Sequence, residues 1–184
     1  MLTIERLLLR EWRDSDREPF AALNADPRVM EFMPHTLSRE ESDRSADRIQ
    51  SHFDQHGFGL FAVELGATEE FIGYIGLATP SFQAQFTPCV EVGWRVAFRH
   101  WGRGLATEGA REALRYGFGT SKLTEIVSFT VPANISSRRV MEKIGMMHNP
   151  VDDFDHPGLP MGNPLRKHVL YRLRSRDWKA GAVS

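Results

Sequence analysis

Cysteine, long hydrophobic runs and net charge are all scarce in this sequence. The 184 residues include a single cysteine, Cys89, which excludes an internal disulfide framework and indicates a reducing compartment. No apolar run approaches the roughly 18 residues of a membrane span, and charges at Glu5, Arg6 and Arg10 come too early for a secretory signal. A net charge of -1 disfavours broad binding to nucleic acids or anionic membranes. These absences predict a cytoplasmic protein with no nucleic-acid or membrane partner.

What remains is the composition of an ordinary globular protein. Hydrophobic residues make up 41% and charged residues 26% of the chain, values typical of a domain that buries a core. No repeat and no low-complexity linker divides the sequence. We therefore expect one domain over residues 1–178 and a short C-terminal tail over residues 179–184.

Periodicity and capping residues predict strands that form a hairpin in the first half of the chain and alternate with helices in the second half. Strands are expected over 4–12, 60–65, 71–78, 89–96, 125–131 and 168–173. Helices are expected over 16–24, 38–55, 104–118 and 133–145, with a short helical piece at 26–34 and a proline-rich loop at 148–167. This order predicts an α/β fold with a mixed sheet and helices packed on it.

The crossing from one strand to the following helix reads RHWGRG. The first N–H groups of a helix lack internal partners and carry partial positive charge, and glycine lets a phosphate approach them. Arg99 and Arg103 add positive charge beside Gly102 and Gly104. The P-loop pattern does not fit because no Lys-Ser/Thr pair follows, and the dinucleotide-binding pattern does not fit because Thr107 stands where a third glycine belongs. A different phosphate-binding loop and a tight turn without a ligand remain as interpretations.

The six residues from Arg99 match the pattern Arg/Gln-x-x-Gly-x-Gly/Ala and resemble the acetyl-CoA pyrophosphate loop of the GNAT N-acetyltransferases. Four further stretches are similar to that superfamily in the same order, especially to the branch that includes the ribosomal-protein N-terminal acetyltransferases. They read TIERLLLREWRDSD, VEVGWRV, GLATEGAREAL and NISSRRVMEKIGM. The resemblance covers nearly the whole chain. It implies a mixed, mostly antiparallel, twisted sheet that splays at the cofactor site, helices on both faces, and acetyl-CoA-dependent N-acetyl transfer to a primary amine.

The resemblance assigns the binding of acetyl-CoA to the loop and to the strand and helix beside it. The residues implied for this role are Trp94, Val96, Arg99, Trp101, Gly102, Arg103, Gly104, Leu105, Ala106, Asn134 and Ser137. In the family, the pantetheine arm lies where the strand before the loop splays from its neighbour. Gly93 fits either a bulge that causes this splay or close backbone packing. No metal is expected.

Two residues are candidates for the chemistry of acetyl transfer. Ser137 follows Asn134 by three positions, and the resemblance implies that its hydroxyl donates to the CoA sulfur, although serine also suits a helix start. Met141 occupies the position where many members carry a tyrosine acid. Glu91 is expected in the middle of a covered strand, where a buried carboxylate needs a partner or a role such as drawing a proton from the amine through water. Glu108 is expected to form structural hydrogen bonds.

The acceptor site is predicted around the proline-rich loop. Asp153, Asp155 and His168 are candidates for binding the acceptor, because a carboxylate suits a cationic amine, and the other interpretation is a solvated loop. The acceptor is expected to be a protein N-terminus or a small amine, and the chain a monomer or homodimer. A non-catalytic CoA-binding sensor and an enzyme for another acyl-CoA remain as alternatives. Surface positions are expected for His35, His52, His56, His100 and His148.

Overall fold

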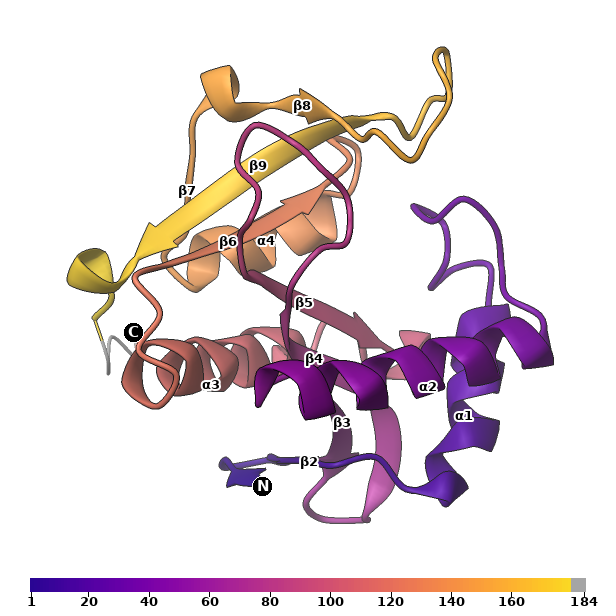
Figure 1. Cartoon of the computed structure of the whole chain (residues 1–184). Helices are drawn as coiled ribbons and strands as arrows, with labels where there is room; N and C mark the ends of the chain where they lie inside the picture. The colour runs from indigo at the N-terminus through magenta and orange to yellow at the C-terminus, as the bar shows by residue number, and fades with distance from the viewer. Residues whose placement is uncertain (180–184) are drawn as a thin grey trace.

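The structure, a computed structural model, describes residues 1–179, so the expected tail lies outside the described residues except for its first position. Figure 1 shows helices packed around a twisted sheet. The strands are β1 (Leu2–Thr3), β2 (Leu7–Arg10), β3 (Leu60–Leu65), β4 (Glu70–Ala78), β5 (Glu91–Val96), β6 (Glu125–Thr130), β7 (Met147–His148), β8 (Phe154–Asp155) and β9 (Lys167–Arg174). The α-helices are α1 (Arg17–Ala25), α2 (Arg39–His56), α3 (Leu105–Gly119) and α4 (Ile135–Lys143).

The sheet divides between β5 and β6. Its strands follow the order β1-β2-β3-β4-β5-β6-β9-β7, with β8 also paired to β9. All ladders are antiparallel except β5–β6, which is parallel and has one registered pair, Glu91 opposite Val127. The structure therefore confirms a mixed, mostly antiparallel sheet that splays at this junction.

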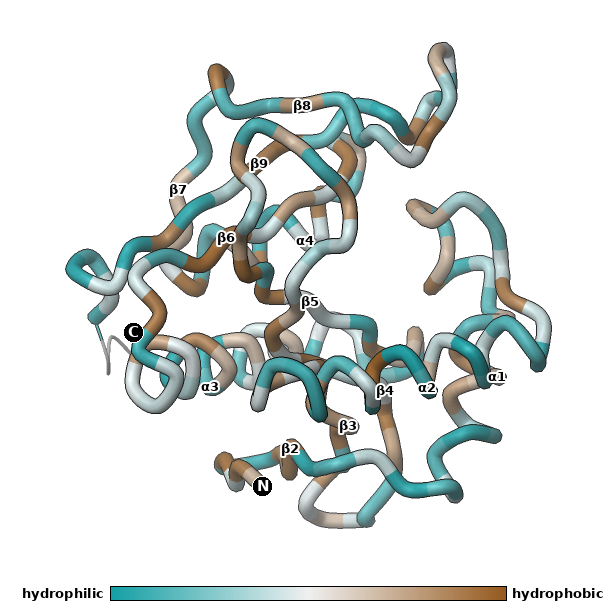
Figure 2. Tube along the Cα trace, viewed as in Figure 1, coloured by the Kyte–Doolittle hydropathy of each residue, from teal (hydrophilic) through white to brown (hydrophobic). Residues whose placement is uncertain are grey.

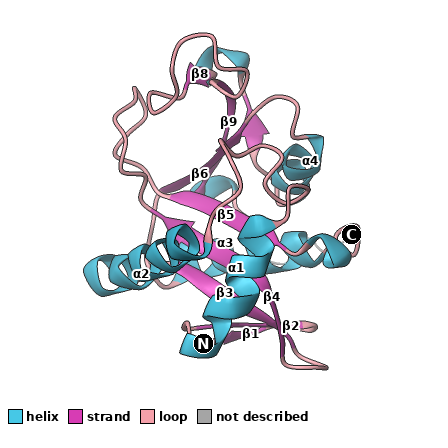
Figure 3. Cartoon of the chain, turned by 90° about the vertical axis from the view of Figure 1, so that its right-hand side faces the viewer, coloured by secondary structure: helices cyan, strands magenta, loops and turns pink. Residues whose placement is uncertain are grey.

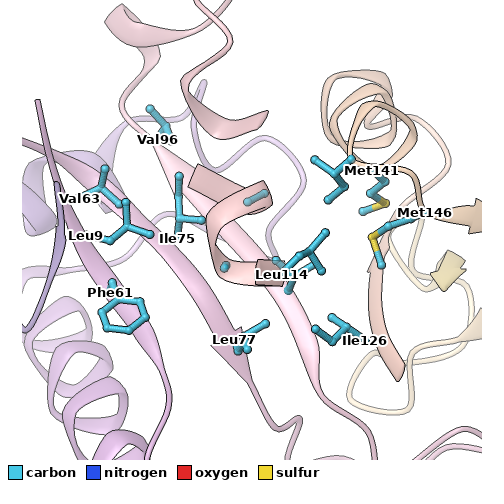
Figure 4. Close-up of a cluster of buried hydrophobic side chains, with 14 of the residues drawn as sticks. Leu9, Phe61, Val63, Ile75, Leu77, Val96, Leu114, Ile126, Met141 and Met146 are labelled. Carbon is cyan, nitrogen blue, oxygen red and sulfur yellow. The ribbon is translucent and has the colours of Figure 1, made fainter. Parts of the chain in front are cut away.

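Helices cover both faces of this sheet. On one face, α3 and α4 pack on the larger core, which includes Leu9, Leu114 and Met141 (Figure 4). On the other face, α1 and α2 enclose a smaller core around Phe20 and Ile49 (Figures 1 and 3). Full burial of one such side chain stabilises the fold by about 1.5–3 kcal/mol.

The ends of α2 follow from local sequence signals. The Ser38 hydroxyl accepts from the Glu41 amide at 3.2 Å, and the Glu41 carboxylate accepts from the Ser38 amide at 2.8 Å. This capping box satisfies two amides that otherwise lack partners. Gly57 ends the helix at a φ of 71°, a left-handed conformation that favours glycine. Figure 2 shows that most of α2 is hydrophilic, and its buried apolar positions are Ala46 and Ile49.

Three local expectations are wrong. Residues 26–34 form turns rather than a short helix, because the Asp26 carboxylate accepts from the Arg28 amide at 3.0 Å and closes a local turn. The long strand expected over 4–12 contains only the four residues of β2. The segment expected as a loop over 148–167 begins within β7 and contains β8, and both of these short strands pair with β9.

Gly93 is not a bulge. It lies opposite Gly76 in an unbroken β4–β5 register, whereas the irregularity of the sheet falls between β3 and β4 at Val63 and Glu64. The splay lies instead between β5 and β6, which share one registered pair, whereas β6 pairs with β9 over its whole length. None of the helices among residues 1–179 has the length and apolar character to cross a membrane.

Candidate active site

A cavity of about 460 Å³ lies where β5 and β6 separate. Its lining draws on both faces of the sheet, since Leu105 and Met141 belong to the core under α3 and α4, whereas Tyr74 and Val29 belong to the core under α1 and α2. We call the lining from 102–107 and from α4 the donor half. The lining from Val29, Phe32, Met33, Tyr74 and Arg95 is the acceptor half. A single cavity therefore connects the two faces through the split.

The loop before α3 gives the donor half its open backbone amides. Gly102 and Gly104 have φ values of 73° and 78°, left-handed conformations that glycine adopts without strain. Gly104 is the N-cap of α3, and among the described residues no side chain caps this helix end. The Glu108 amide makes the first helical bond, to the Gly104 carbonyl at 3.0 Å. The amides of Leu105 and Ala106 therefore remain available to an anion.

The two arginines of this loop do not line the cavity. Arg99 Nε donates to Glu70 at 2.9 Å, and this pairing holds the pKa of Glu70 below its usual range. Arg103 Nη1 lies 3.1 Å from His100 Nδ1, and His100 Nε2 lies 3.3 Å from the Glu70 carboxylate. The expected surface position of His100 is wrong, because its side chain is buried in this network. In this structure the arginines brace the loop against β4 rather than reaching into the cavity.

A second brace holds the start of α3. Arg6 donates to the Glu108 carboxylate from its amide at 2.9 Å and from Nε at 2.7 Å, and its Nη1 donates to the Arg103 carbonyl at 2.9 Å. The structural role expected for Glu108 is confirmed. The open amides are thus held by ion pairs on both sides of the loop, which reduces the reorganisation needed to bind an anion.

The separated edge of β5 offers further amides. Backbone groups alternate in direction along a strand. The Ala97 amide donates to β4 at 2.8 Å, whereas the Val92 carbonyl accepts from the Ser128 hydroxyl of β6 at 2.9 Å. The amides of Trp94 and Val96 therefore point toward the split, where β6 has moved away. Both residues line the cavity.

Two other predicted cofactor residues, Trp101 and Asn134, have structural contacts of their own. The Trp101 indole donates to the Val96 carbonyl at 2.7 Å. Asn134 is the N-cap of α4, because its Oδ1 accepts from the Ser137 amide at 3.2 Å while its Nδ2 donates to Thr130 at 3.0 Å. These contacts fix the loop and the helix that face each other across the cavity, and both side chains belong to its lining.

Ser137 sits in the first turn of α4 and lines the donor half. Its amide is capped by Asn134, and within residues 1–179 its hydroxyl makes no hydrogen bond. Met141, one turn further along α4, is 1% exposed and packs in the core. Ser137 thus presents an uncommitted hydroxyl to the cavity one turn before Met141, the position where many family members carry a tyrosine.

Glu91 is the first residue of β5 rather than its middle, and its side chain is half-buried in the cavity wall. It lies beside Gly93, where an added Cβ would stand 4.0 Å from Glu91 Oε1. Burial raises the pKa of this carboxyl to about 8. Glu91 is therefore a titratable group in the cavity that exchanges a proton near neutral pH.

The acidic residues of the 148–167 loop lie outside this cavity. Asp153 and Asp155 line a second cavity of about 400 Å³. Asp153 contacts His148 Nε2 at 2.7 Å, and Asp155 pairs with Arg166 at 3.1 Å. These carboxylates therefore lie apart from the main cavity and have partners of their own, and their expected role in binding the acceptor stays a prediction.

His168 stands behind the cavity wall. Its ring packs 6.0 Å from the ring of Phe129, which lines the main cavity, and 5.5 Å from that of Phe154. Its Nδ1 lies 3.1 Å from the Arg166 carbonyl, and burial lowers the pKa of His168. His168 therefore supports the wall rather than touching the space within it. Among residues 1–179, no three His, Cys, Asp or Glu side chains are grouped as metal ligands.

Comparison with known proteins decides which family shares this architecture. Residues 6–147 match the family described as Acetyltransferase (GNAT) domain. The chain belongs to the GNAT acetyltransferase family. It is similar to the N-acetyltransferase YnaD of Bacillus subtilis, at 30% identity over 177 residues that cover 96% of this chain and 98% of the relative.

Two further likenesses support the assignment of this GNAT chain as an N-acetyltransferase. The FsC-acetyl coenzyme A-N(2)-transacetylase of Aspergillus fumigatus is 31% identical over 178 residues, covering 88% of this chain and 71% of the relative. The crystal structure of a GNAT-family acetyltransferase from Bacillus anthracis superposes with a TM-score of 0.77 at 27% identity, covering 95% of this chain and 98% of that chain.

Sequence reasoning missed several residues of this GNAT cavity. Arg139 and Lys143 lie one turn apart on α4 and line the donor half. Their spacing of four residues in an expected helix could have predicted two cations on one helix face. The acceptor half was missed almost entirely. Its residues come from the connector between α1 and α2, from β4 and from β5, and nothing in the local sequence links these segments.

Proposed function

We propose that this GNAT enzyme transfers the acetyl group of acetyl-CoA to a primary amine at the β5–β6 split, with residues 1–178 as a single catalytic domain. The observation that carries the proposal is the continuity of the cavity. Open amides at the start of α3 face it from one side of the sheet, and an apolar chamber faces it from the other. A thioester held in the first part can then meet an amine held in the second.

The donor half suits acetyl-CoA, which members of this family use. The amides from Gly102 to Ala106 would bind the pyrophosphate, because an uncapped helix N-terminus attracts anions. Arg139 and Lys143 are the proposed side-chain partners of the remaining phosphates, in place of Arg99, which is paired with Glu70. The acetyl coenzyme A named for the Aspergillus relative supports the same donor.

The chemistry proposed is direct attack. The amine nitrogen forms a bond to the thioester carbonyl carbon, the carbon–sulfur bond breaks, and the sulfur leaves as a thiolate that takes up a proton. The amides of Trp94 and Val96 would polarise the carbonyl, and the free hydroxyl of Ser137 would donate to the sulfur. A thiol with a pKa near ~8.5 leaves readily, so the donation assists rather than enables the step.

Glu91 is the proposed acceptor of the amine proton, through water. An α-amine has a pKa near ~7.7–8.0, whereas a lysine-like amine has a pKa near ~10.4 and is almost wholly protonated at neutral pH. A carboxyl with a pKa of about 8 becomes a base as the pH rises through that value. The likeness to the ribosomal-protein branch favours α-amines, on a protein N-terminus or a small molecule.

Release of free thiol from acetyl-CoA, measured with a panel of amines, tests the proposal. Saturable turnover with both substrates is the expected result. Tight cofactor binding without turnover on any amine would instead identify a non-catalytic sensor. Release from a longer acyl-CoA but not from acetyl-CoA would identify a different acyl donor.

A further inference from the structure

Arg95 is the feature of the acceptor half that the reaction as proposed does not use. It follows Gly93 by two positions on β5, lies opposite Tyr74 of β4, and lines the cavity. Its Nη1 donates to Asn24 Oδ1 at 2.6 Å, and its guanidinium carbon lies 5.4 Å from the centre of the Tyr74 ring. Within residues 1–179 it forms no ion pair. A half-buried cation therefore lines the cavity, and its contacts with Asn24 and Tyr74 leave its charge unpaired among the described residues.

Arg10, a buried arginine with a structural role, provides a comparison for Arg95. Arg10 is 5% exposed and pairs with two carboxylates, Asp16 at 2.7 Å and Glu64. At Arg95 the corresponding partner is the amide of Asn24, which is fully buried and held by Ser42 at 2.9 Å. The fold thus orients the guanidinium without neutralising it. An uncompensated charge away from bulk water costs free energy unless an anion joins it.

The residues around Arg95 indicate which other chemical groups a ligand of this guanidinium would carry. Val29, Phe32 and Met33 of the connector and Tyr74 of β4 make the chamber mainly apolar. A guanidinium carries five N–H donors, of which the contact with Asn24 uses one, so a carboxylate can be bound by two parallel hydrogen bonds. The absence of a side chain at Gly93 leaves room for such a ligand along β5.

We infer that Arg95 recognises a carboxylate on the acceptor, so that the substrate of this enzyme is a small primary amine with both an apolar part and a carboxylate. The inference rests on the proposed function. It also excludes polyamines as good substrates, because a second ammonium group would approach the guanidinium at the cost of like-charge repulsion.

The test compares amines in matched pairs that differ only in the carboxylate. Phenylalanine with 2-phenylethylamine and leucine with 3-methylbutylamine are two such pairs, and spermine serves as a polyamine. Free-thiol release gives kcat/KM for each, corrected for the fraction of each amine that is unprotonated. We expect the carboxylated member to be preferred by about 10- to 100-fold, the usual effect of a hydrogen bond to a charged group.

Three variants identify the residue responsible. Asn24→Asp places a carboxylate against Arg95 with little change of shape, and it should lower the preference at least about tenfold. Arg95→Leu should bring the ratio close to one. Arg28→Leu is the matched control, since Arg28 is exposed and already paired with Asp26 at 2.7 Å, and its ratio should equal that of the wild type. Thermal melting and acetyl-CoA affinity establish that each variant is folded.

Each outcome decides the inference. A higher kcat/KM for the carboxylate-free members or for spermine overturns it, and so does a preference that persists in both Asn24→Asp and Arg95→Leu. These results leave the proposed acetyl transfer intact, because thiol is still released. No thiol release with any amine overturns the proposed function together with the inference.

Discussion

The donor half of the cavity presents open backbone amides together with the side chains of α4, whereas the acceptor half presents side chains of the α1–α2 connector, β4 and β5. On the donor side, the available hydrogen-bond donors include the backbone amides of the loop before α3 and of the edge of β5. On the acceptor side the chamber is formed by apolar and aromatic side chains with one guanidinium. Binding by backbone amides depends on the conformation of the loop, which few residue types can adopt. Binding by side chains depends on their chemical groups, so a substitution there changes which ligand is preferred. The two halves should therefore respond differently to mutation.

The largest effect is expected at Gly104. Gly104→Val forces a β-branched residue to a φ of 78° and adds a side chain beside the open amides of α3. Left-handed strain of about 1–3 kcal/mol, added to lost contact with the pyrophosphate, should weaken acetyl-CoA binding by roughly 100-fold or more. Titration calorimetry measures this affinity.

Gly162→Val is the control for that substitution. Gly162 has a φ of 83° in the 148–167 loop, and an added Cβ would meet nothing within 4 Å. Its backbone strain should resemble that of Gly104→Val, with acetyl-CoA affinity unchanged. Equal losses of affinity in both folded variants would attribute the effect to general strain and remove the loop from the cofactor site.

A pH-dependent effect is expected at Glu91. Because its pKa is raised to about 8, Glu91 is mostly protonated below that pH and resembles glutamine there. Glu91→Gln should therefore lose about 100-fold in kcat/KM well above pH 8, the lower range for general base catalysis, and little in mildly acidic solution. Parallel pH–rate profiles of the two enzymes would assign the base elsewhere.

A smaller effect is expected at Ser137. Ser137→Ala removes the only group proposed to assist the leaving thiolate, which departs readily without help. Turnover should fall by at most about 100-fold, with acetyl-CoA affinity unchanged. Ser137→Thr keeps a hydroxyl and should recover part of the loss. If single-turnover rates of Ser137→Ala equal those of the wild type, the residue serves only the start of α4.

No effect on catalysis is expected at Asp155. Its carboxylate pairs with Arg166 at 3.1 Å and lines the second cavity, so Asp155→Asn should leave kcat and every KM within about twofold. A binding role for the acidic loop would instead raise the KM of the acceptor alone. Steady-state kinetics with a cationic and a neutral acceptor distinguish these outcomes.

The contrast between the halves also explains what the sequence could predict. The RHWGRG crossing and the pattern after Asn134 are local, because each depends on residues a few positions apart. Gly102 and Gly104 of the first and Ser137 of the second line the cavity. The capping box at Ser38 and the C-terminal glycine of α2 are equally local, and the helix expected over 38–55 agrees with α2.

What was missed depends on long-range pairing. Arg99 is drawn away from the cavity by Glu70, 29 residues earlier, and His100 is buried by the same contact. Arg95 is oriented by Asn24, 71 residues earlier. No spacing within the sequence encodes such partners, since they are fixed only when the strands have their final register. The same reason explains why the sequence does not show that the acidic loop lines a separate cavity.

The single registered pair between β5 and β6 has a consequence for isotope exchange. Among the described strands, the ladder near Glu91 is the only pairing between β1–β5 and the group formed by β6, β9, β7 and β8, which Figure 1 shows as two parts of the molecule. The amides of Trp94 and Val96 lack a strand partner on the split side, so their protons should exchange with deuterium faster than those of Gly93 and Arg95, which face β4. If acetyl-CoA binds in the split as proposed, it should slow that exchange without any change of fold, so these two amides would report cofactor binding directly.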